Sequence, residues 1–347
     1  MKNTIQILRF LSEATGRGEG TALMTITNVI GHTARSPGTH LAVSSTGASV
    51  GSLSGGCVEA AAIREALEAI KAVETSTIRF GTGSPYIDIR LPCGGAMDIL
   101  IVPNPPIAVL AETISRLERR ETVSLQLSRT EPVALGADLE STTGWLGETF
   151  RAVHRPDLRL VILGHGAETI CLARLAVAFG ADVVVISPDD AVVAEAGLLS
   201  VNAQPLQRQG RSDHLIGDPF SAAVFLFHDH AWESDLLIQA LDQDFLLIGA
   251  MGSQATHKRR IENLRLQGVG QEKLASILGP IGLIPGARDP QTLALSILSQ
   301  VVAHYEERCA SKASHPAKTH QLEVKEPLPN ATAPVRVKQR HFEHAER

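Results

Sequence analysis

The sequence predicts an α/β protein in which an N-terminal α/β domain is followed by a Rossmann-like domain with a doubly wound parallel sheet. The composition is globular, with 44% hydrophobic and 20% charged residues, and 347 residues are enough for two domains with sizeable cores. Strand-like apolar runs alternate with helical periodicity along most of the chain. A glycine turn between a strand and a helix, near residue 164, is typical of a nucleotide-binding βαβ unit.

The N-terminal domain, residues 1–156, is predicted from its patterns in chain order. Residues 5–14 repeat apolar side chains at helical spacing, and residues 21–30 are dense in Thr, Ile and Val, which favours a buried strand. The further elements expected are two strands within 40–56, a helix at 58–72, strands at 75–83 and 96–105, a helix at 107–120 and strands within 121–153.

The second domain, residues 157–310, opens with strand, glycine turn, helix and strand. Its other expected elements are strands at 222–228 and 245–252, a helix at 232–243 between them and a closing helix at 291–308. The last segment, 311–347, is proline-spaced and poor in large apolar side chains, so it is predicted to be a disordered tail.

The net charge and the hydropathy of the chain indicate which kinds of partner to expect. The formal net charge of −5 and the pI near 6.2 give no general attraction to nucleic acid or to membrane surfaces. The N-terminus has no apolar run of signal-peptide length, and no apolar stretch approaches the roughly twenty residues of a membrane span. We therefore expect a cytoplasmic protein whose partners are small molecules or other proteins.

The glycine turn, which begins with Gly164 and Gly166, departs from the dinucleotide fingerprint. Its third position is Thr169 rather than Gly or Ala, and Ser187 stands where an acidic residue would hold a ribose, with Asp189 two residues late. Two interpretations stay open. Either the turn binds phosphate at the helix N-terminus, or it is kept for packing and binds no free dinucleotide.

Two polar motifs follow predicted strands of the second domain. His228 and His230 flank an aspartate and suit metal ligation or acid–base work, or simple hydrogen bonding to nearby loops. Gly252 and Ser253 begin a second motif that suits an anion site, with Thr256 as a further donor. A solvated helix start would have the same sequence, and its basic cluster, Lys258, Arg259 and Arg260, is then ordinary surface charge.

Four cysteines are too few for a disulfide scaffold and lack zinc-site spacing. Cys57 and Cys93 each adjoin two glycines, as GGC and CGG. Cys57 also lies where a glycine loop leads into a helix, whose N-terminal amides would stabilise a thiolate. The alternative is an inert buried thiol, and Cys171 and Cys309 are interpreted as core or exposed thiols.

Several motifs in one order resemble the XdhC/CoxI family of accessory proteins, which serve molybdenum hydroxylases such as xanthine and aldehyde dehydrogenases. The resemblance covers nearly all of residues 15–305. Its motifs are GHTARSPG, GSLSGGCVE, the CGG before a strand, the GxG turn, HDH, GAMGS and PIGLIPGARDPQTLALSIL. The chain departs from the family pattern at His32, Ala34, Ile284 and Gln300.

The resemblance implies a chaperone that binds molybdenum cofactor, protects it during sulfuration and inserts it into an apo molybdenum hydroxylase. It implies a maturation factor rather than an enzyme, with a cysteine desulfurase or a cofactor-biosynthesis enzyme as second partner, and it is compatible with a homodimer. The cargo would be molybdopterin cofactor or its cytosine dinucleotide form, with Cys57 as a molybdenum ligand. The cofactor-binding residues it implies are Arg35, Gly55, Gly56, Cys57, Glu59, Cys93, Gly94, Gly95, Gly164, Gly166, His228, His230, Gly252 and Ser253.

Two alternatives come from other classes. An NAD(P)-dependent oxidoreductase would hold pyrophosphate at Gly164 and Gly166 and use His228 or His230 as proton donor. A regulatory protein would bind a nucleotide without chemistry.

Overall fold

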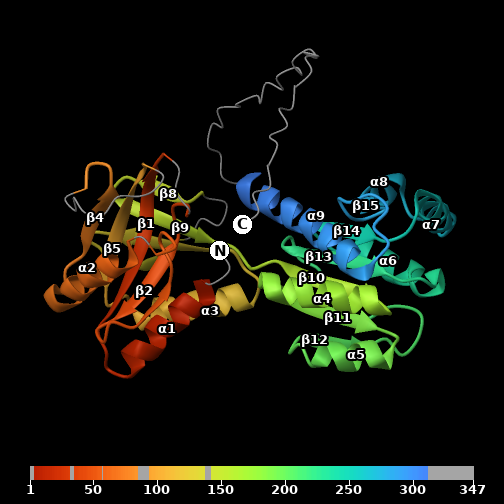
Figure 1. Cartoon of the computed structure of the whole chain (residues 1–347), viewed down its shortest axis with the longest axis horizontal. Helices are drawn as coiled ribbons and strands as arrows, with labels where there is room; N and C mark the ends of the chain where they lie inside the picture. The colour runs from red at the N-terminus through yellow and green to blue at the C-terminus, as the bar shows by residue number, and fades with distance from the viewer. Residues whose placement is uncertain (1–3, 32–34, 57, 85–93, 137–141, 312–347) are drawn as a thin grey trace, which may run out of the picture. The chain divides into compact units, whose positions relative to one another are not determined.

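The computed structural model describes residues 4–31, 35–56, 58–84, 94–136 and 142–311. The predicted α/β class is confirmed, with antiparallel sheets in the N-terminal domain and one parallel sheet in the Rossmann-like domain (Figure 1). Apart from residue 311, the predicted tail lies outside the described residues. No helix in the described part of the chain is both long and apolar enough to cross a membrane.

A five-stranded antiparallel sheet organises the first part of the N-terminal domain, in the order β3-β2-β1-β5-β4. Its strands are β1 (Thr21–Ile30), β2 (His40–Ser44), β3 (Ser49–Gly51), β4 (Ser76–Gly81) and β5 (Ala96–Pro103). Strand alternation sends Ala22 and Met24 to the face covered by α2 (Glu59–Ala72). Leu23 points to the opposite face, where it joins a second core.

That second core is shared with two helices and another sheet. The helices are α1 (Thr4–Gly16) and α3 (Ile107–Glu118), which contribute Leu8 and Leu110 to it. The sheet is antiparallel with the order β7-β6-β9-β8. Its strands are β6 (Val123–Ser128), β7 (Ala134–Gly136), β8 (Gly144–Leu146) and β9 (Thr149–His154).

The Rossmann-like domain has a six-stranded parallel sheet in the order β12-β11-β10-β13-β14-β15. Its strands are β10 (Arg159–Gly164), β11 (Asp182–Ser187), β12 (Asn202–Pro205), β13 (Ser221–Leu226), β14 (Leu247–Ala250) and β15 (Ile277–Leu278). Strands β10 and β13 are almost wholly buried because helices cover both faces, which explains their continuous apolar runs.

Helices cover the two faces of this sheet in separate groups. One face packs against α4 (Ala167–Phe179), α5 (Asp190–Gly197) and α9 (Pro290–Ser311). The other packs against α6 (Ser234–Leu241), α7 (Gln254–Leu266) and α8 (Gln271–Ala275). The helix expected at 232–243 begins as a 3₁₀ turn, η1 (His230–Trp232), before α6.

The order of the parallel strands predicts where on this sheet a ligand would bind. The chain builds outward from β10 to β12 and then returns to add β13 beside β10, so the strand order reverses between these two neighbours. In such sheets the crevice at the carboxyl ends of the strands, at the point of reversal, is the usual ligand site. The loops after β10, β13, β14 and β15 all leave the sheet at that edge.

Candidate functional site

Two glycine motifs of the N-terminal domain meet at one end of the five-stranded sheet. Strand β1 ends at Ile30, which pairs with Ala96, the first residue of β5. The loops beyond these residues are therefore neighbours. A Cβ atom on Gly31 would lie 3.4 Å from the Cα of Gly95, so the backbones approach closely there.

The third motif loop leaves the same end of this sheet. Strand β3 ends at Gly51, which lies opposite Leu41 near the start of β2, so residues 52–56 follow at the end of the sheet where β1 ends. The antiparallel topology thus brings described residues of three motifs to one end of a single sheet, although they are distant in sequence: Gly31 of GHTARSPG, residues 52–56 of GSLSGGC, and Gly94 and Gly95 of CGG. Arg35, Gly55, Gly56 and Gly94 are exposed there, whereas Gly95 is buried. Cys57 and Cys93 lie outside the described residues.

The loop before α2 surrounds the carboxylate of Glu59. Five backbone N–H groups and two hydroxyls donate to it at 2.7–3.2 Å, namely those of Ser52 (hydroxyl), Leu53, Ser54 (both groups), Gly55, Gly56 and Val58. Partial burial raises the pKa of the Glu59 carboxyl, but the hydrogen bonds from Ser54 and Ser52 outweigh it and hold the pKa at about 2. Glu59 is therefore ionised at neutral pH, and its oxygens are occupied by its own loop.

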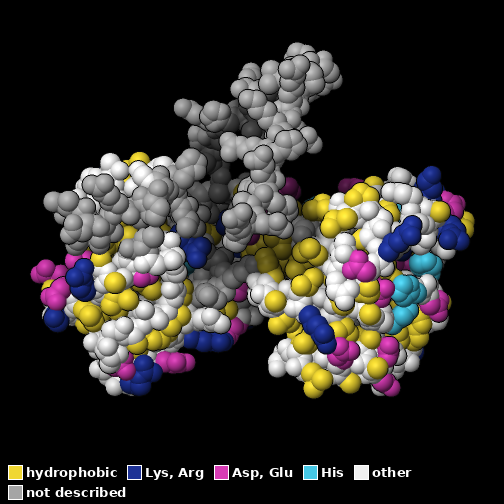
Figure 2. Space-filling view, viewed as in Figure 1, with side chains coloured by type: hydrophobic (Ala, Val, Ile, Leu, Met, Phe, Trp, Pro, Cys, Tyr) yellow, Lys and Arg dark blue, Asp and Glu magenta, His cyan; other side chains and the backbone are white. Residues whose placement is uncertain are grey.

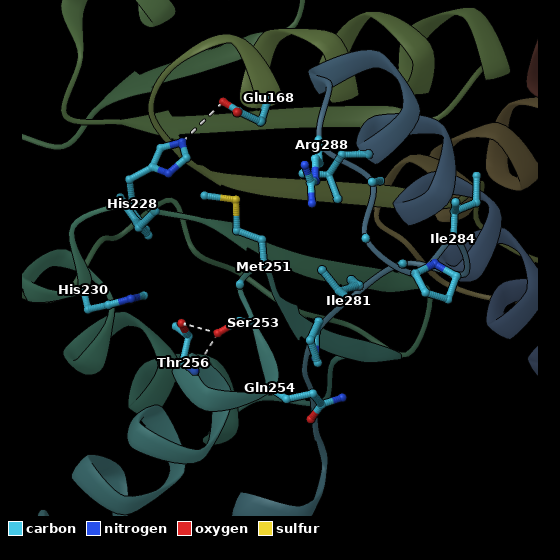
Figure 3. Close-up of a pocket in the computed structure, with 18 residues that line it drawn as sticks. Glu168, His228, His230, Met251, Ser253, Gln254, Thr256, Ile281, Ile284 and Arg288 are labelled. Atoms are coloured by element: carbon cyan, nitrogen blue, oxygen red, sulfur yellow. Dashed lines mark hydrogen bonds and ion pairs between the residues drawn. The ribbon is translucent and has the colours of Figure 1, made fainter.

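The Rossmann-like domain contains a cavity of about 750 Å³ at the carboxyl ends of its strands (Figure 3). The volume lies within the range of small-molecule and cofactor sites. Its polar lining includes Glu168, His228, His230, Ser253, Thr256 and Arg288. Four of the sequence-predicted residues, His228, His230, Gly252 and Ser253, thus line one cavity, while Gly164 and Gly166 are not among its lining residues.

His228 lies between two polar groups of the glycine turn. Its Nε2 atom is 3.5 Å from Oε2 of Glu168, and its backbone N–H donates to Nε2 of His165 at 3.4 Å. The His228 side chain is 60% exposed, so it is open to a ligand in the cavity. Figure 2 shows histidine side chains gathered on the exposed surface of this domain.

His230 faces a different partner. Its Nδ1 atom lies 2.9 Å from Oε2 of Glu233, a carboxylate that also pairs with Arg260 at 3.0 Å. Both side chains of the Glu233–Arg260 pair are only 3% exposed, and Arg260 also donates to the carbonyl of Met251 at 2.7 Å. The interpretation of Arg260 as surface charge is therefore wrong, because it is a buried ion-pair partner that joins the loops after β13 and β14.

The two imidazoles of the HDH motif do not converge on one point with a third ligand. Asp229 accepts a hydrogen bond from the N–H of Ala231 and caps the 3₁₀ turn. Among the described residues, no group of three or more His, Cys, Asp or Glu side chains is placed to hold a metal ion. The contacts of His228, Asp229 and His230 within the chain match the interpretation of simple hydrogen bonding to nearby loops.

The glycine turn is shaped by packing. A Cβ on Gly164 would lie 2.7 Å from the carbonyl oxygen of Leu226 and 2.8 Å from Oγ1 of Thr169, so glycine is required for β10 to approach β13 and α4. A Cβ on Gly166, where φ is +80°, would lie 3.3 Å from Oε2 of Glu168. The carboxylate of Glu168 thus stands at the α4 N-terminus, where a pyrophosphate would otherwise bind, and its charge opposes such binding.

The second strand of this unit is also unsuited to hold a ribose. Ser187 is fully buried and accepts a hydrogen bond from the N–H of Asp189. Asp189 in turn accepts from the N–H of Ala191 and caps α5. These contacts favour the interpretation in which the glycine turn is kept for helix–strand packing over the interpretation in which it binds a dinucleotide.

Ser253 begins α7 as its N-cap residue. Its hydroxyl oxygen accepts from the N–H of Thr256 at 3.1 Å, and the two hydroxyl groups lie 3.0 Å apart (Figure 3). Gly252 has φ of +135°, and a Cβ there would lie 3.0 Å from Cγ2 of Thr256. This glycine is therefore needed for the turn into the helix, and both hydroxyls remain on the wall of the cavity.

Two charged residues of the cavity are not identified as site residues by the sequence patterns. Glu168 lies two residues after Gly166, the second glycine of the turn. The sequence pattern that could have identified it is an acidic residue in the first turn of a helix that begins at the crevice of such a sheet. Arg288 follows β15, and its guanidinium has no hydrogen-bond or ion-pair partner among the described residues. The sequence pattern that could have identified Arg288 as a site residue is a basic residue in a Gly/Pro-rich loop after a parallel strand.

The fold and the cavity define an α/β protein with a Rossmann-like ligand domain, and the comparisons agree. Residues 14–81 match the XdhC and CoxI family, and residues 160–301 match the XdhC Rossmann domain. The chain is 35% identical over 304 residues to the molybdenum cofactor insertion chaperone PaoD of Escherichia coli, covering 87% of this chain and 89% of that protein. The chain therefore belongs to the XdhC and CoxI family.

Two further relatives extend the comparison. A Bacillus subtilis protein, named as a probable subunit of xanthine dehydrogenase, is 25% identical over 82% of this chain and 93% of its own length. A crystal structure described as a xanthine dehydrogenase from Bacillus halodurans aligns with a TM-score of 0.69 over 87% of this chain and 96% of that chain. Its sequence identity is 20%, so it supports the fold alone.

Proposed function

We propose that this protein binds molybdenum cofactor as cargo and inserts it into an apo molybdenum hydroxylase of the xanthine or aldehyde dehydrogenase type. The observation that carries the proposal is family membership together with 35% identity, over most of both chains, to a protein named as a molybdenum cofactor insertion chaperone. The meeting of described residues from three family motifs at one end of the N-terminal sheet supports it, since a cargo site needs residues from several loops.

The N-terminal loops suit the metal end of the cofactor. A thiolate is a soft ligand that molybdenum accepts, and Cys57 belongs to the loop whose neighbouring glycines are exposed. A Cβ added to Gly55 or Gly56 would have no described atom within 4 Å, so a flat, bulky group can approach the backbone there. Cys57 is the proposed molybdenum ligand, and Arg35, Cys93, Gly94 and Gly95 are the other proposed cofactor-binding residues from these loops.

The cavity of the Rossmann-like domain suits the phosphate-bearing end of the same kind of molecule. The guanidinium of Arg288 pairs well with phosphate, and the hydroxyls of Ser253 and Thr256 add neutral donors. His228 and His230 complete a polar lining that accepts either the molybdopterin form or its cytosine dinucleotide form. The larger form would use more of the 750 Å³ available.

The finer parts of the proposal concern partners and organisation. The cofactor is held while its terminal sulfur ligand is installed, with a cysteine desulfurase or a cofactor-biosynthesis enzyme as the supplier. The handover takes place in the cytoplasm, between a homodimer of this chain and the apo hydroxylase. Residues 1–156 and 157–310 act as the two ligand-bearing domains, and 311–347 as a tail.

Cofactor loading of the purified protein tests the proposal. The protein is incubated anaerobically with molybdenum cofactor and desalted, and the molybdenum and pterin that remain bound are measured. We expect near-stoichiometric retention and none with molybdate alone. Equal retention of molybdate would indicate an oxyanion-binding protein instead, and retention of neither would contradict the proposal.

A further inference from the structure

The loop between β3 and α2 is built around an anion that the chain itself supplies. Successive N–H groups in a glycine-rich loop form a concave nest that commonly holds a phosphate or another anion. In this protein the nest holds the carboxylate of Glu59, the first residue of α2. The N–H groups of this loop that could bind a phosphate thus already donate to a carboxylate of the chain itself.

This arrangement gives the loop two distinct sides. On the inner side, the amides of Gly55 and Gly56 donate to Glu59 at 3.0 and 2.8 Å, so they are not available to a ligand. On the outer side, a Cβ at either glycine would meet no described atom within 4 Å, and φ of +86° and +124° makes glycine the favoured residue. A ligand therefore meets the open side of a loop that is held from within.

Hydrogen bonds to Glu59 bracket position 57. The N–H of Gly56 precedes it and the N–H of Val58 follows it, and both donate to Oε2 of Glu59. The hydroxyl of Ser54 reinforces the bracket, because it donates to the same carboxylate oxygen and accepts from the N–H of Val58 at 3.1 Å. One side chain thereby holds the N–H groups of the residues immediately before and after position 57.

Only a carboxylate of this length satisfies all these donors. Seven N–H and O–H groups point at its oxygens, and an ionised carboxylate has acceptor sites only. Gln would present an NH₂ group to some of these donors, and Asp is shorter by one methylene.

We propose that Glu59 is a positioning residue of the loop between β3 and α2: it does not contact the cofactor but fixes the backbone N–H groups of Gly56 and Val58, the two residues that flank Cys57 in the sequence. The cofactor part of this inference rests on the proposed function. It replaces the sequence-based expectation of a direct contact between Glu59 and the cofactor with a role exerted through the loop.

The test compares Glu59→Gln and Glu59→Asp with Glu68→Gln, which removes an exposed carboxylate of the same helix that pairs with Lys71. Amide hydrogen exchange of the peptide spanning 52–58 is measured without cofactor. We expect at least tenfold faster exchange in Glu59→Gln, an intermediate rate in Glu59→Asp and a wild-type rate in Glu68→Gln. An unchanged rate in Glu59→Gln would overturn the anchoring role.

Cofactor retention by the same variants is the second measurement, and Glu59→Asp, which keeps the carboxylate, should restore part of what Glu59→Gln loses. Cofactor retention should fall at least fivefold in Glu59→Gln. Faster exchange with full retention would overturn the positioning role, whereas absence of retention by the wild type would contradict the proposed function and leave the anchoring result standing.

Discussion

The imidazoles of His40 and His154 meet in the interior of the N-terminal domain, with 3.0 Å between their Nε2 atoms. The Nδ1 atom of His40 lies 2.8 Å from the hydroxyl of Thr25, and that of His154 lies 3.5 Å from the hydroxyl of Thr4. One Nε2–H must donate to the other Nε2, so the accepting ring is neutral, and burial, which lowers the pKa of both rings, keeps the donating ring neutral as well. The pair joins β2, directly after the GHTARSPG loop, to β9 of the second sheet.

This pair predicts a stability that depends on mildly acidic pH. Burial lowers the pKa of His40 to about 4, and burial together with the nearby His40 lowers the pKa of His154 well below 6.5. The unfolded imidazoles take up protons below pH 6.5 while the folded ones do not. Stability should therefore be full above pH 6.5 and fall as the pH decreases toward 4, by at most roughly 1.4 kcal/mol per pH unit for each ring.

Urea unfolding across this window measures the effect. His154→Gln removes one titrating ring and should flatten the profile, whereas His214→Gln, at an exposed position, should keep the wild-type slope. A wild-type stability independent of pH across this range would show that the pair is not held neutral.

Because Glu233 and Arg260 form a buried ion pair, removing one partner should destabilise the protein more than removing both. Glu233→Gln leaves the guanidinium of Arg260 buried without its counter-charge, which typically costs about 3–5 kcal/mol. The double variant Glu233→Gln/Arg260→Met should recover part of this loss, since no charge is then left unpaired. Denaturant midpoints of the single and double variants give the coupling, and equal losses in both would contradict a direct ion pair.

Gly164 should tolerate no side chain. A Cβ there would lie 2.7 Å from the carbonyl of Leu226, so Gly164→Ala should destabilise the protein by about 1–3 kcal/mol. Gly197, in the same domain, has open space at its Cβ position, and Gly197→Ala should stay within about 0.5 kcal/mol of wild type. A similar stability for both variants would show that β10 and β13 can separate at no cost.

The oxidoreductase alternative predicts nicotinamide dinucleotide binding, and the geometry of the glycine turn predicts its absence. The carboxylate of Glu168 stands at the helix N-terminus, and Asp189 is engaged as a cap. Added NAD(P)H should therefore leave the emission of Trp232 unchanged at submillimolar concentration, and no aldehyde or ketone should oxidise it. Micromolar quenching with turnover would establish the alternative.

Arg288→Gln is a cleaner test of ligand binding in the cavity than a change at the glycine turn. From sequence alone, if the turn cradles a phosphate, Gly166→Val is expected to reduce ligand binding much more than stability. The φ of +80° at Gly166 means that valine would also strain the backbone, so a loss of binding would not separate the two effects. Arg288→Gln changes the cavity without backbone strain and should reduce cofactor retention several-fold while leaving the denaturant midpoint unchanged.

Cys57→Ser should lower bound molybdenum while keeping the fold. Oxygen for sulfur nearly preserves the volume but removes the soft ligand. Metal analysis after loading should show at least a fivefold loss relative to wild type, and Cys171→Ser, in the other domain, should show none. Full molybdenum retention by Cys57→Ser would remove this residue from the site.

The sequence predicts the parts of the structure that depend on local pattern. The strand at 21–30 and the helix at 58–72 match β1 and α2, because β1 begins with a continuous buried run rich in β-branched residues and α2 is rich in strong helix formers. The order of strands in the first sheet is a long-range property, and the meeting of the glycine motifs could not be read from spacing. It follows only from the pairing of β1 with both β2 and β5.

The charged residues show the same limit more sharply. Arg260 belongs to a basic run at a helix start, which is normally solvated, and only the buried Glu233 in another loop makes it an interior residue. Glu59 is one acidic residue in a helix rich in Ala and Glu, and nothing local shows that seven donors converge on it. Sequence pattern identifies the motif strings, but the partner of each charge depends on tertiary contacts.

Direct transfer of cofactor tests the central claim most closely. Wild-type protein is loaded with molybdenum cofactor, freed of excess by desalting, and mixed with an apo xanthine or aldehyde dehydrogenase in the presence of a scavenger for free cofactor. We predict that hydroxylase activity appears with loaded wild type at a rate at least tenfold above that with loaded Cys57→Ser or with free cofactor alone. Activation by free cofactor at the same rate as by the loaded protein would contradict a role in insertion.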